Sequence, residues 1–145
     1  MNLSEHFTLE ELTISETASR RNLNNTPDNI ALYNLRRLAL FLEDVRALLG
    51  KPIKNNSAYR APKVNASVGG SKTSQHCIGC AADIRVAGMT PDEVVRAIIK
   101  SDLQYDQVIR EFDSWTHISI PNRKEDKPRK MALIIDNFGT KKYGS

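Results

Sequence analysis

The sequence contains no hydrophobic run long enough to cross a membrane, which takes about 20 predominantly apolar residues. Its opening segment, 1–6, has neither the basic start nor the apolar run of a secretory signal peptide. Internal repeats, low-complexity stretches and interdomain linkers are missing as well. These absences predict a single domain over residues 1–145 that is synthesised in the cytoplasm and has no membrane span.

Neither charge nor composition is extreme. The chain has 145 residues, of which 40% are hydrophobic and 26% charged, as in ordinary globular proteins with one core. The formal net charge of +4 is mildly basic. It is compatible with an anionic polymer as partner, such as nucleic acid or bacterial cell wall, and equally with a solvated surface that has no special partner.

One long helix is predicted over residues 27–49, because leucine and valine recur there every three or four residues. Thr26 is its expected cap and Pro27 its first residue, while Gly50 is its expected stop. Two shorter helices are predicted by capping boxes, one at Thr8 with Glu11 and one at Thr90 with Glu93.

Strands are predicted later in the chain, after the long helix. The pattern of residues 105–112 and 115–120 predicts two strands joined by a short turn, that is, a hairpin. Other strands are expected over 53–60, 81–87 and 131–135, and residues 139–145 are expected to form a frayed tail. The resulting fold class is α+β, with N-terminal helices packed on a small, mostly antiparallel sheet.

A histidine and an aspartate share one short stretch, at His76 and Asp83. Side chains alternate along a strand, so Asp83 points away from the face that Ile84 occupies. An inward-facing carboxylate needs a partner, because an unpaired buried charge is costly. A histidine and a carboxylate are two of the three protein ligands of a catalytic zinc site, and His117 in the hairpin supplies a third. The sequence thus predicts one Zn²⁺ ion bound by these residues.

Hydrolysis at a zinc site also needs a carboxylate base and a group that stabilises the oxyanion. Glu111 and Asp113 are both candidates for the base, because both lie close to His117 in the hairpin. Arg60, at the end of its predicted strand, is the candidate for the oxyanion. Taken singly, each residue also has a plainer interpretation, as a core histidine, a surface ion pair or a solvated charge.

The two cysteines, Cys77 and Cys80, follow His76 directly. In a reducing compartment a Cys-x-x-Cys pair suggests metal binding or redox chemistry. A structural zinc site usually needs a second such pair, which this sequence lacks. We therefore expect both cysteines to be free thiols that fill space beside the predicted zinc site.

Four segments resemble the zinc D-Ala-D-Ala carboxypeptidase-like family of metallopeptidases, and the likeness covers nearly the whole chain. They are residues 57–65, 68–76, 79–84 and 115–119, and the opening at 7–12 also resembles the family's usual start. The pattern Ser-x-His-x-x-Gly-x-Ala-x-Asp is met in full. The chain is most similar to the branch that holds cell-wall peptidases and many phage or prophage proteins.

The resemblance implies that His76, Asp83 and His117 bind zinc and that zinc-bound water is the nucleophile. It implies that Arg60, from the Ser-x-Tyr-Arg motif, orients or polarises the scissile carbonyl. The expected reaction is hydrolysis of a peptide bond in bacterial peptidoglycan, by carboxypeptidase or endopeptidase action. Substrate binding is assigned to five residues of the matching segments: Ser57, Tyr59, Ser74, Gln75 and Trp115.

The position of the catalytic acidic residue in this chain differs from its position in part of the family. Several relatives place it three residues before the last zinc histidine, and this chain has Ser114 there. Glu111 is similar to the acidic residue of the phage-type branch, so it is the first candidate for the base and Asp113 the second. The expected enzyme is a monomer. Because no signal peptide is recognised, release by phage lysis, as for an endolysin, or carriage in a phage particle is its simplest route to the cell wall.

Two other functions are open. A cell-wall-binding module could keep the zinc fold without turnover, and it would need no base. A structural zinc protein could use His76, Cys77 and Cys80 and bind nucleic acid through the basic loop 123–130. That loop carries no interleaved aromatic residues, which counts against nucleic acid as partner.

Overall fold

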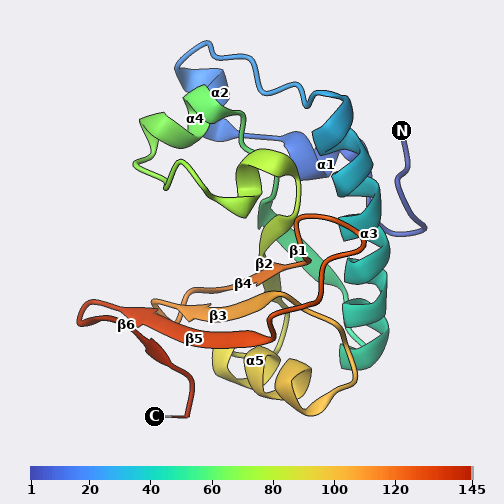
Figure 1. The fold of residues 1–145 in the computed structure, drawn as a ribbon, viewed down its shortest axis with the longest axis vertical. Helices are drawn as coiled ribbons and strands as arrows, with labels where there is room; N and C mark the ends of the chain where they lie inside the picture. The colour runs from blue at the N-terminus through green and yellow to red at the C-terminus, as the bar shows by residue number, and fades with distance from the viewer. Residues whose placement is uncertain (145) are drawn as a thin grey trace.

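A computed structural model of the chain describes residues 1–144 and shows an α+β architecture (Figure 1). The elements, in chain order, are α1 (Leu9–Thr13), α2 (Glu16–Arg20), α3 (Asn29–Leu49), β1 (Ile53–Ser57), α4 (Pro62–Ser67), the 3-10 helix η1 (Gln75–Ile78), β2 (Ala81–Val86), α5 (Pro91–Lys100), β3 (Gln107–Glu111), β4 (Trp115–Ser119), β5 (Met131–Asp136) and β6 (Gly139–Lys142). The strands form one sheet in the order β1-β2-β4-β3-β5-β6. Only β3 and β5 are parallel neighbours in the described chain, so the predicted fold class is confirmed.

The two faces of the sheet have different roles. Ile84 on β2, Val108 on β3 and Ile118 on β4 point to one face and share a single hydrophobic core with α3 and α5. The alternation of side chains leaves Asp83, Ile109 and His117 on the opposite face. The short helices α1, α2 and α4 lie together at one end of the molecule, at the top of Figure 1. The opposite face of the sheet is therefore available for a site.

The long helix α3 begins two residues later than its sequence pattern suggests. The side chain of Asp28, and not that of Thr26, caps the helix by accepting a hydrogen bond from the amide of Ala31 at 2.8 Å. Pro27 consequently lies outside the helix. The C-terminal end is as predicted, because Gly50 adopts the left-handed conformation that ends a helix.

The capping boxes of α1 and α5 are present as predicted. Two other expectations were wrong, namely the end of the first strand at residue 60 and the frayed tail over 139–145. The first strand ends at Ser57, because the chain then turns away and the amide of Tyr59 bonds to the carbonyl of Leu12. The expected tail instead forms β6, whose residues pair with β5. Ser145, at the end of that tail, lies outside the described residues.

Helix α2 has no counterpart among the predicted elements. It is one turn long, and the Ser15 side chain caps it through the amide of Ala18 at 3.1 Å. No helix within residues 1–144 combines the length and the apolar character that a membrane crossing requires.

Candidate metal centre and its cleft

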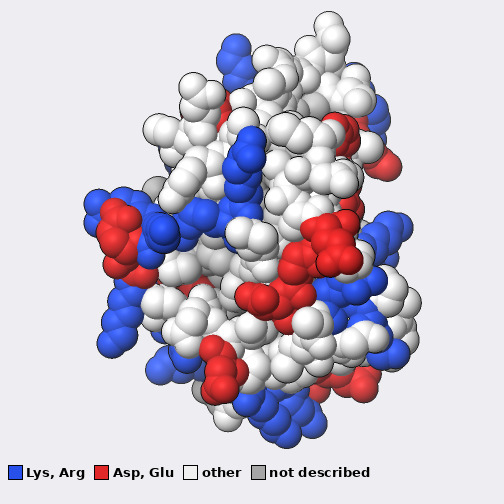
Figure 2. Space-filling model, turned by 90° about the vertical axis from the view of Figure 1, so that its right-hand side faces the viewer, with Lys and Arg blue, Asp and Glu red and all other residues white. Residues whose placement is uncertain are grey.

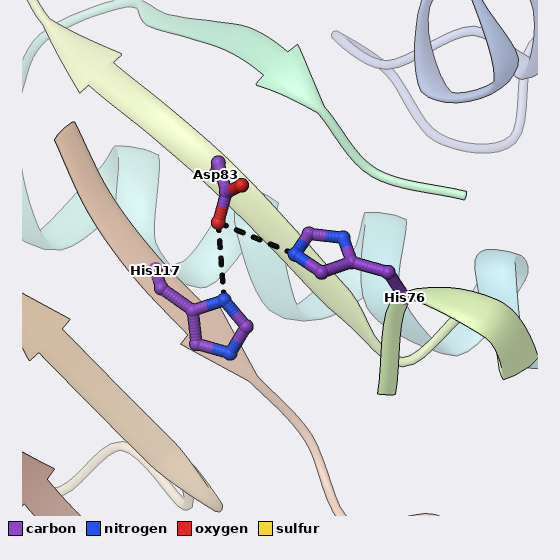
Figure 3. Close-up of side chains that lie close together, drawn as sticks. All are labelled: His76, Asp83 and His117. Atoms are coloured by element: carbon purple, nitrogen blue, oxygen red, sulfur yellow. Dashed lines mark hydrogen bonds and ion pairs between the residues drawn. The ribbon is translucent and has the colours of Figure 1, made fainter. Parts of the chain in front are cut away.

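Three buried side chains meet on the open face of the sheet (Figure 3). Asp83 on β2 and His117 on β4 are direct partners in the antiparallel register. His76 reaches them from η1, whose end at Gly79 leads straight into β2. The structure therefore brings together the three residues that the sequence proposes as metal ligands.

The spacing of their donor atoms fits a zinc ion. Oδ1 of Asp83 lies 3.0 Å from Nδ1 of His117 and 3.3 Å from Nε2 of His76. One donor atom from each residue lies within 4.8 Å of the other two. Ligands around a tetrahedral zinc are about 3.3 Å apart when the bonds are about 2.0 Å long. Two imidazole nitrogens and one carboxylate oxygen are also a common donor set for a catalytic zinc ion.

The ring of His76 is oriented by the backbone. Its Nδ1–H donates to the carbonyl oxygen of Ala58 at 2.6 Å, since a carbonyl can only accept. In the neutral ring Nε2 is then an acceptor, and it faces the carboxylate of Asp83. Two acceptors in contact require a cation or a proton between them. The carbonyl of Ala58 thus acts as the outer partner that metal-bound histidines usually have.

Electrostatics favour an ionised Asp83. Burial by itself raises the pKa of this carboxyl, but hydrogen bonds to His117 and His76 outweigh burial and hold the pKa well below its usual range. The carboxylate is therefore ready to bind a cation at neutral pH.

The three residues lie in a cleft with a volume of about 630 Å³. Segment 69–76 forms one wall, and the strands of the sheet form the other. Glu111 lines this cleft and shares the face of His117, because Ile109 is the direct partner of His117 and Glu111 follows two residues later. Burial and then the negative charge of Asp83 raise the pKa of Glu111. A carboxylate with a raised pKa beside a metal centre has the properties of a general base.

Asp113 lies elsewhere. It sits in the β3–β4 turn with 70% of its side chain exposed, and its carboxylate forms an ion pair with Nε of Arg110 at 2.6 Å. Residues 112 and 113 both have positive φ angles, and neither of them lines the cleft. The geometry therefore favours Glu111 over Asp113 as the base.

Arg60 lies on the border of the cleft and of a second hollow of about 480 Å³. Its amide donates to the carbonyl of His76 at 3.1 Å, which ties it to the metal-ligand segment. Its Nε is buried and has no hydrogen-bond partner among the described residues. Because Arg60 also lines the cleft, its guanidinium can serve a bound substrate.

The five predicted substrate-binding residues are not equivalent in the structure. Ser74, Gln75 and Trp115 line the cleft, whereas Ser57 lines only the second hollow. Tyr59 lines neither, because the turn after β1 directs it into the hydrophobic core. This placement argues against a substrate contact by Tyr59.

The cysteines are separate from the metal cluster. Both are free thiols, and Cys80 is completely buried in the core. Burial raises the pKa of Cys80 to about 11 and also raises the pKa of Cys77. The group of possible metal ligands that lie within 4.8 Å of one another contains neither thiol, so both cysteines lie outside the metal cluster.

Two further residues of interest, Asp106 and Arg129, were not found from the sequence. Arg129 lines the cleft, and buried Asp106 holds it through several hydrogen bonds. They precede β3 and β5, which are parallel neighbours. Asp106 lies inside the strand predicted over 105–112, and no pattern in the sequence connects it with Arg129.

Comparison with known proteins adds one match. The model of the family described as Peptidase M15 matches residues 5–119, which include the three clustered residues together with Arg60 and Glu111. A comparison with curated proteins gives no match. Arg129 and the strands β5 and β6 lie beyond the matched range.

Proposed function

Because this chain belongs to the Peptidase M15 family of zinc D-Ala-D-Ala carboxypeptidase-like enzymes, we propose that it hydrolyses a peptide bond in the peptides of bacterial peptidoglycan. Membership of the family supports a metallopeptidase. The observation that carries the proposal is the buried cluster of His76, Asp83 and His117 in a cleft that Glu111 and Arg60 also line.

In this proposal His76, Asp83 and His117 hold a single zinc ion, His76 through Nε2 because Nδ1 is bound to Ala58. Zinc in such a site lowers the pKa of water and polarises a carbonyl group. The remaining steps belong to side chains of the cleft.

Glu111 takes the proton of the attacking water and then delivers it to the leaving amine. Its raised pKa suits both steps, since the group has to accept and release a proton near neutral pH. Arg60, which lines the cleft, donates to the carbonyl oxygen through its guanidinium as negative charge develops on that oxygen.

A peptide substrate also agrees with the charge distribution. Figure 2 shows Lys and Arg intermingled with Asp and Glu on the face it presents, without a broad field of one sign. A polyanion would favour a continuous basic surface. We also propose a cell-wall peptide as the partner, with the protein acting as a monomer that phage-type release brings to the wall.

The test is mass spectrometry of soluble products after purified, zinc-loaded protein is incubated with peptidoglycan, with and without a chelator. We expect defined peptide fragments whose release the chelator abolishes, and the masses identify the bond. If zinc-loaded protein releases nothing from several wall types but still sediments with them, the protein is a wall-binding module and not a peptidase.

A further inference from the structure

The β3–β4 turn holds an aromatic residue in a conformation that aromatic residues avoid. Phe112 and Asp113 are the two central residues of this turn, which the amide of Ser114 closes by donating to the carbonyl of Glu111 at 2.9 Å. Both have positive φ, +52° for Phe112 and +51° for Asp113. Two-residue turns of this kind favour asparagine, aspartate and glycine, and a bulky side chain at positive φ is strained. Local backbone preference therefore does not account for Phe112.

Burial does not account for it either, because Phe112 is 47% exposed. Its ring packs against that of Trp115, with the ring centroids 6.1 Å apart and the planes tilted by 50°. Nε1 of Trp115 is buried, so the part of its side chain that solvent reaches is carbon. We call the apolar surface formed by these two rings the aromatic corner. Strained residues and exposed apolar surface both gather at binding sites.

The aromatic corner continues the cleft of the metal centre. Trp115 lines that cleft together with Glu111 and His117. Alternation places Trp115 on the same face as His117, two residues or about 7 Å along β4. Phe112 directly follows Glu111, whose partner across the hairpin is Trp115. A polymer that is bound at the metal centre and leaves the cleft at this end therefore passes over the aromatic corner.

The surroundings of the aromatic corner are polar. Asp113, whose carboxylate pairs with Arg110, has 70% of its side chain exposed, and Ser114 lies between it and Trp115 in sequence. Two aromatic rings beside a carboxylate and a hydroxyl group match a sugar, which has an apolar C–H face and a rim of hydroxyl groups. A lipid or an apolar peptide side chain would favour a continuous apolar surface instead.

We propose that the aromatic corner binds a sugar ring of the glycan strand to which the peptides of peptidoglycan are attached. The inference rests on the proposed function, because it takes the same polymer as the ligand, and it adds a carbohydrate subsite to the peptide cleft. Phe112 and Trp115 stack on the C–H face of the sugar, and the polar groups of the turn face its hydroxyl groups. Sugar-linked wall peptides are then better substrates than the bare peptides.

Trp115 is the only tryptophan of the chain, so its fluorescence reports directly on the aromatic corner. The first experiment titrates zinc-loaded protein with a soluble oligosaccharide of N-acetylglucosamine and follows the emission of Trp115. This ligand has no peptide bond between residues, so the measurement does not depend on peptidase activity. We expect a saturable change in emission. No change up to the solubility limit of the oligosaccharide overturns the inference.

Phe112→Asn tests the aromatic corner without weakening the fold, because asparagine is favoured at this turn position and should not lower the unfolding temperature. We expect its sugar affinity to fall about two- to tenfold, the range of one aromatic contact, while Trp115 still supplies the signal. Tyr33→Ala is the matched control, since Tyr33 is 53% exposed but belongs to α3, which packs on the other face of the sheet. Unchanged affinity in Phe112→Asn, or an equal loss in both variants, overturns the inference.

The second experiment compares the turnover of a stem peptide that is linked to its sugar with that of the same peptide without the sugar. For the wild type we expect a kcat/KM about two- to tenfold higher for the sugar-linked peptide, and in Phe112→Asn this ratio should fall towards one. Equal turnover of the two substrates by the wild type overturns the inference while supporting the proposed function. Sugar binding that Phe112→Asn weakens, without cleavage of either substrate, supports the subsite and contradicts the proposed function.

Discussion

Asp83 and His117 face each other across β2 and β4, with 3.0 Å between Oδ1 and Nδ1. Both belong to neighbouring strands inside the sheet, so the ladder of backbone hydrogen bonds sets the distance between them. Two of the three proposed metal ligands are thus positioned by the pairing of two interior strands, and His76 completes the set from η1. Such preorganisation favours tight metal binding.

Replacement of Asp83 by Asn should lower the zinc content of the purified protein to well below one equivalent, because the only negative ligand of the cluster is lost. Elemental analysis after dialysis measures this. The control is Cys77→Ser combined with Cys80→Ala, which should keep one equivalent, since neither thiol belongs to the cluster. Loss of zinc in the cysteine variant would show that the cysteines are ligands.

Glu111→Gln should reduce kcat by about 10²- to 10⁴-fold and leave the zinc content unchanged, because the variant lacks a base but keeps the three metal ligands. Steady-state kinetics on a stem peptide measures the loss. Asp113→Asn is the comparison, and we expect its rate to stay within about twofold of wild type, given that Asp113 pairs with Arg110 in the exposed turn. The reverse result would assign the base to Asp113.

The ion pair of Asp106 and Arg129 makes stability depend on pH. Burial raises the pKa of Asp106, but the hydrogen bonds and charge of Arg129 outweigh it, so the pKa in the folded state lies below the ordinary value of 3.8. The stabilisation is complete above the unfolded pKa of about 3.8 to 3.9 and is lost as the pH falls through the lower folded pKa.

Asp106→Asn should accordingly be less stable than wild type by about 1–3 kcal/mol at pH 7, and the difference should begin to shrink near pH 3.8 and disappear only once the pH is below the lower folded pKa of Asp106. Urea unfolding at a series of pH values measures this difference. A difference that stays constant down to the most acidic samples would mean that the charge of Asp106 contributes nothing.

Gly79 joins η1 to β2 and has a φ of +80°, and a Cβ there would lie 2.6 Å from the carbonyl oxygen of Ala31. Gly79→Ala should therefore destabilise the protein and disturb the approach of His76 to Asp83. Gly88→Ala is the matched control, because its φ is +78° but the nearest atom, Nζ of Lys51, would be 3.6 Å away.

Both alanine variants carry the cost of a left-handed residue, about 1–2 kcal/mol, and only Gly79→Ala adds the collision with α3. Thermal unfolding should give a clearly larger loss for Gly79→Ala, with weaker zinc binding in addition. Equal losses of thermal stability in the two variants would mean that α3 shifts enough to accommodate the added Cβ atom.

Local signals account for the parts of the structure that the sequence predicts. The capping boxes at Thr8 and Thr90 are hydrogen bonds between residues three apart in sequence. Alternation along β2 separates Asp83 from Ile84 and alternation along β4 separates His117 from Ile118, and the register that pairs Asp83 with His117 puts the two on one face. The cap of α3 was misplaced because Thr26 and Asp28 both have suitable oxygens, and only the packing of the helix selects between them.

The sequence by itself determined the fold class, the two strands of the metal centre and the three residues that meet there, because each follows from short-range periodicity or from a continuous motif. Only the tertiary structure decided that Glu111 lines the cleft while Asp113 turns away, that Tyr59 enters the core and that Asp106 holds Arg129. These relationships depend on which strands become neighbours and how the turns between them are aimed. Strand pairing and turn direction are determined by how the whole hydrophobic core is buried, and they cannot be predicted from any local sequence pattern.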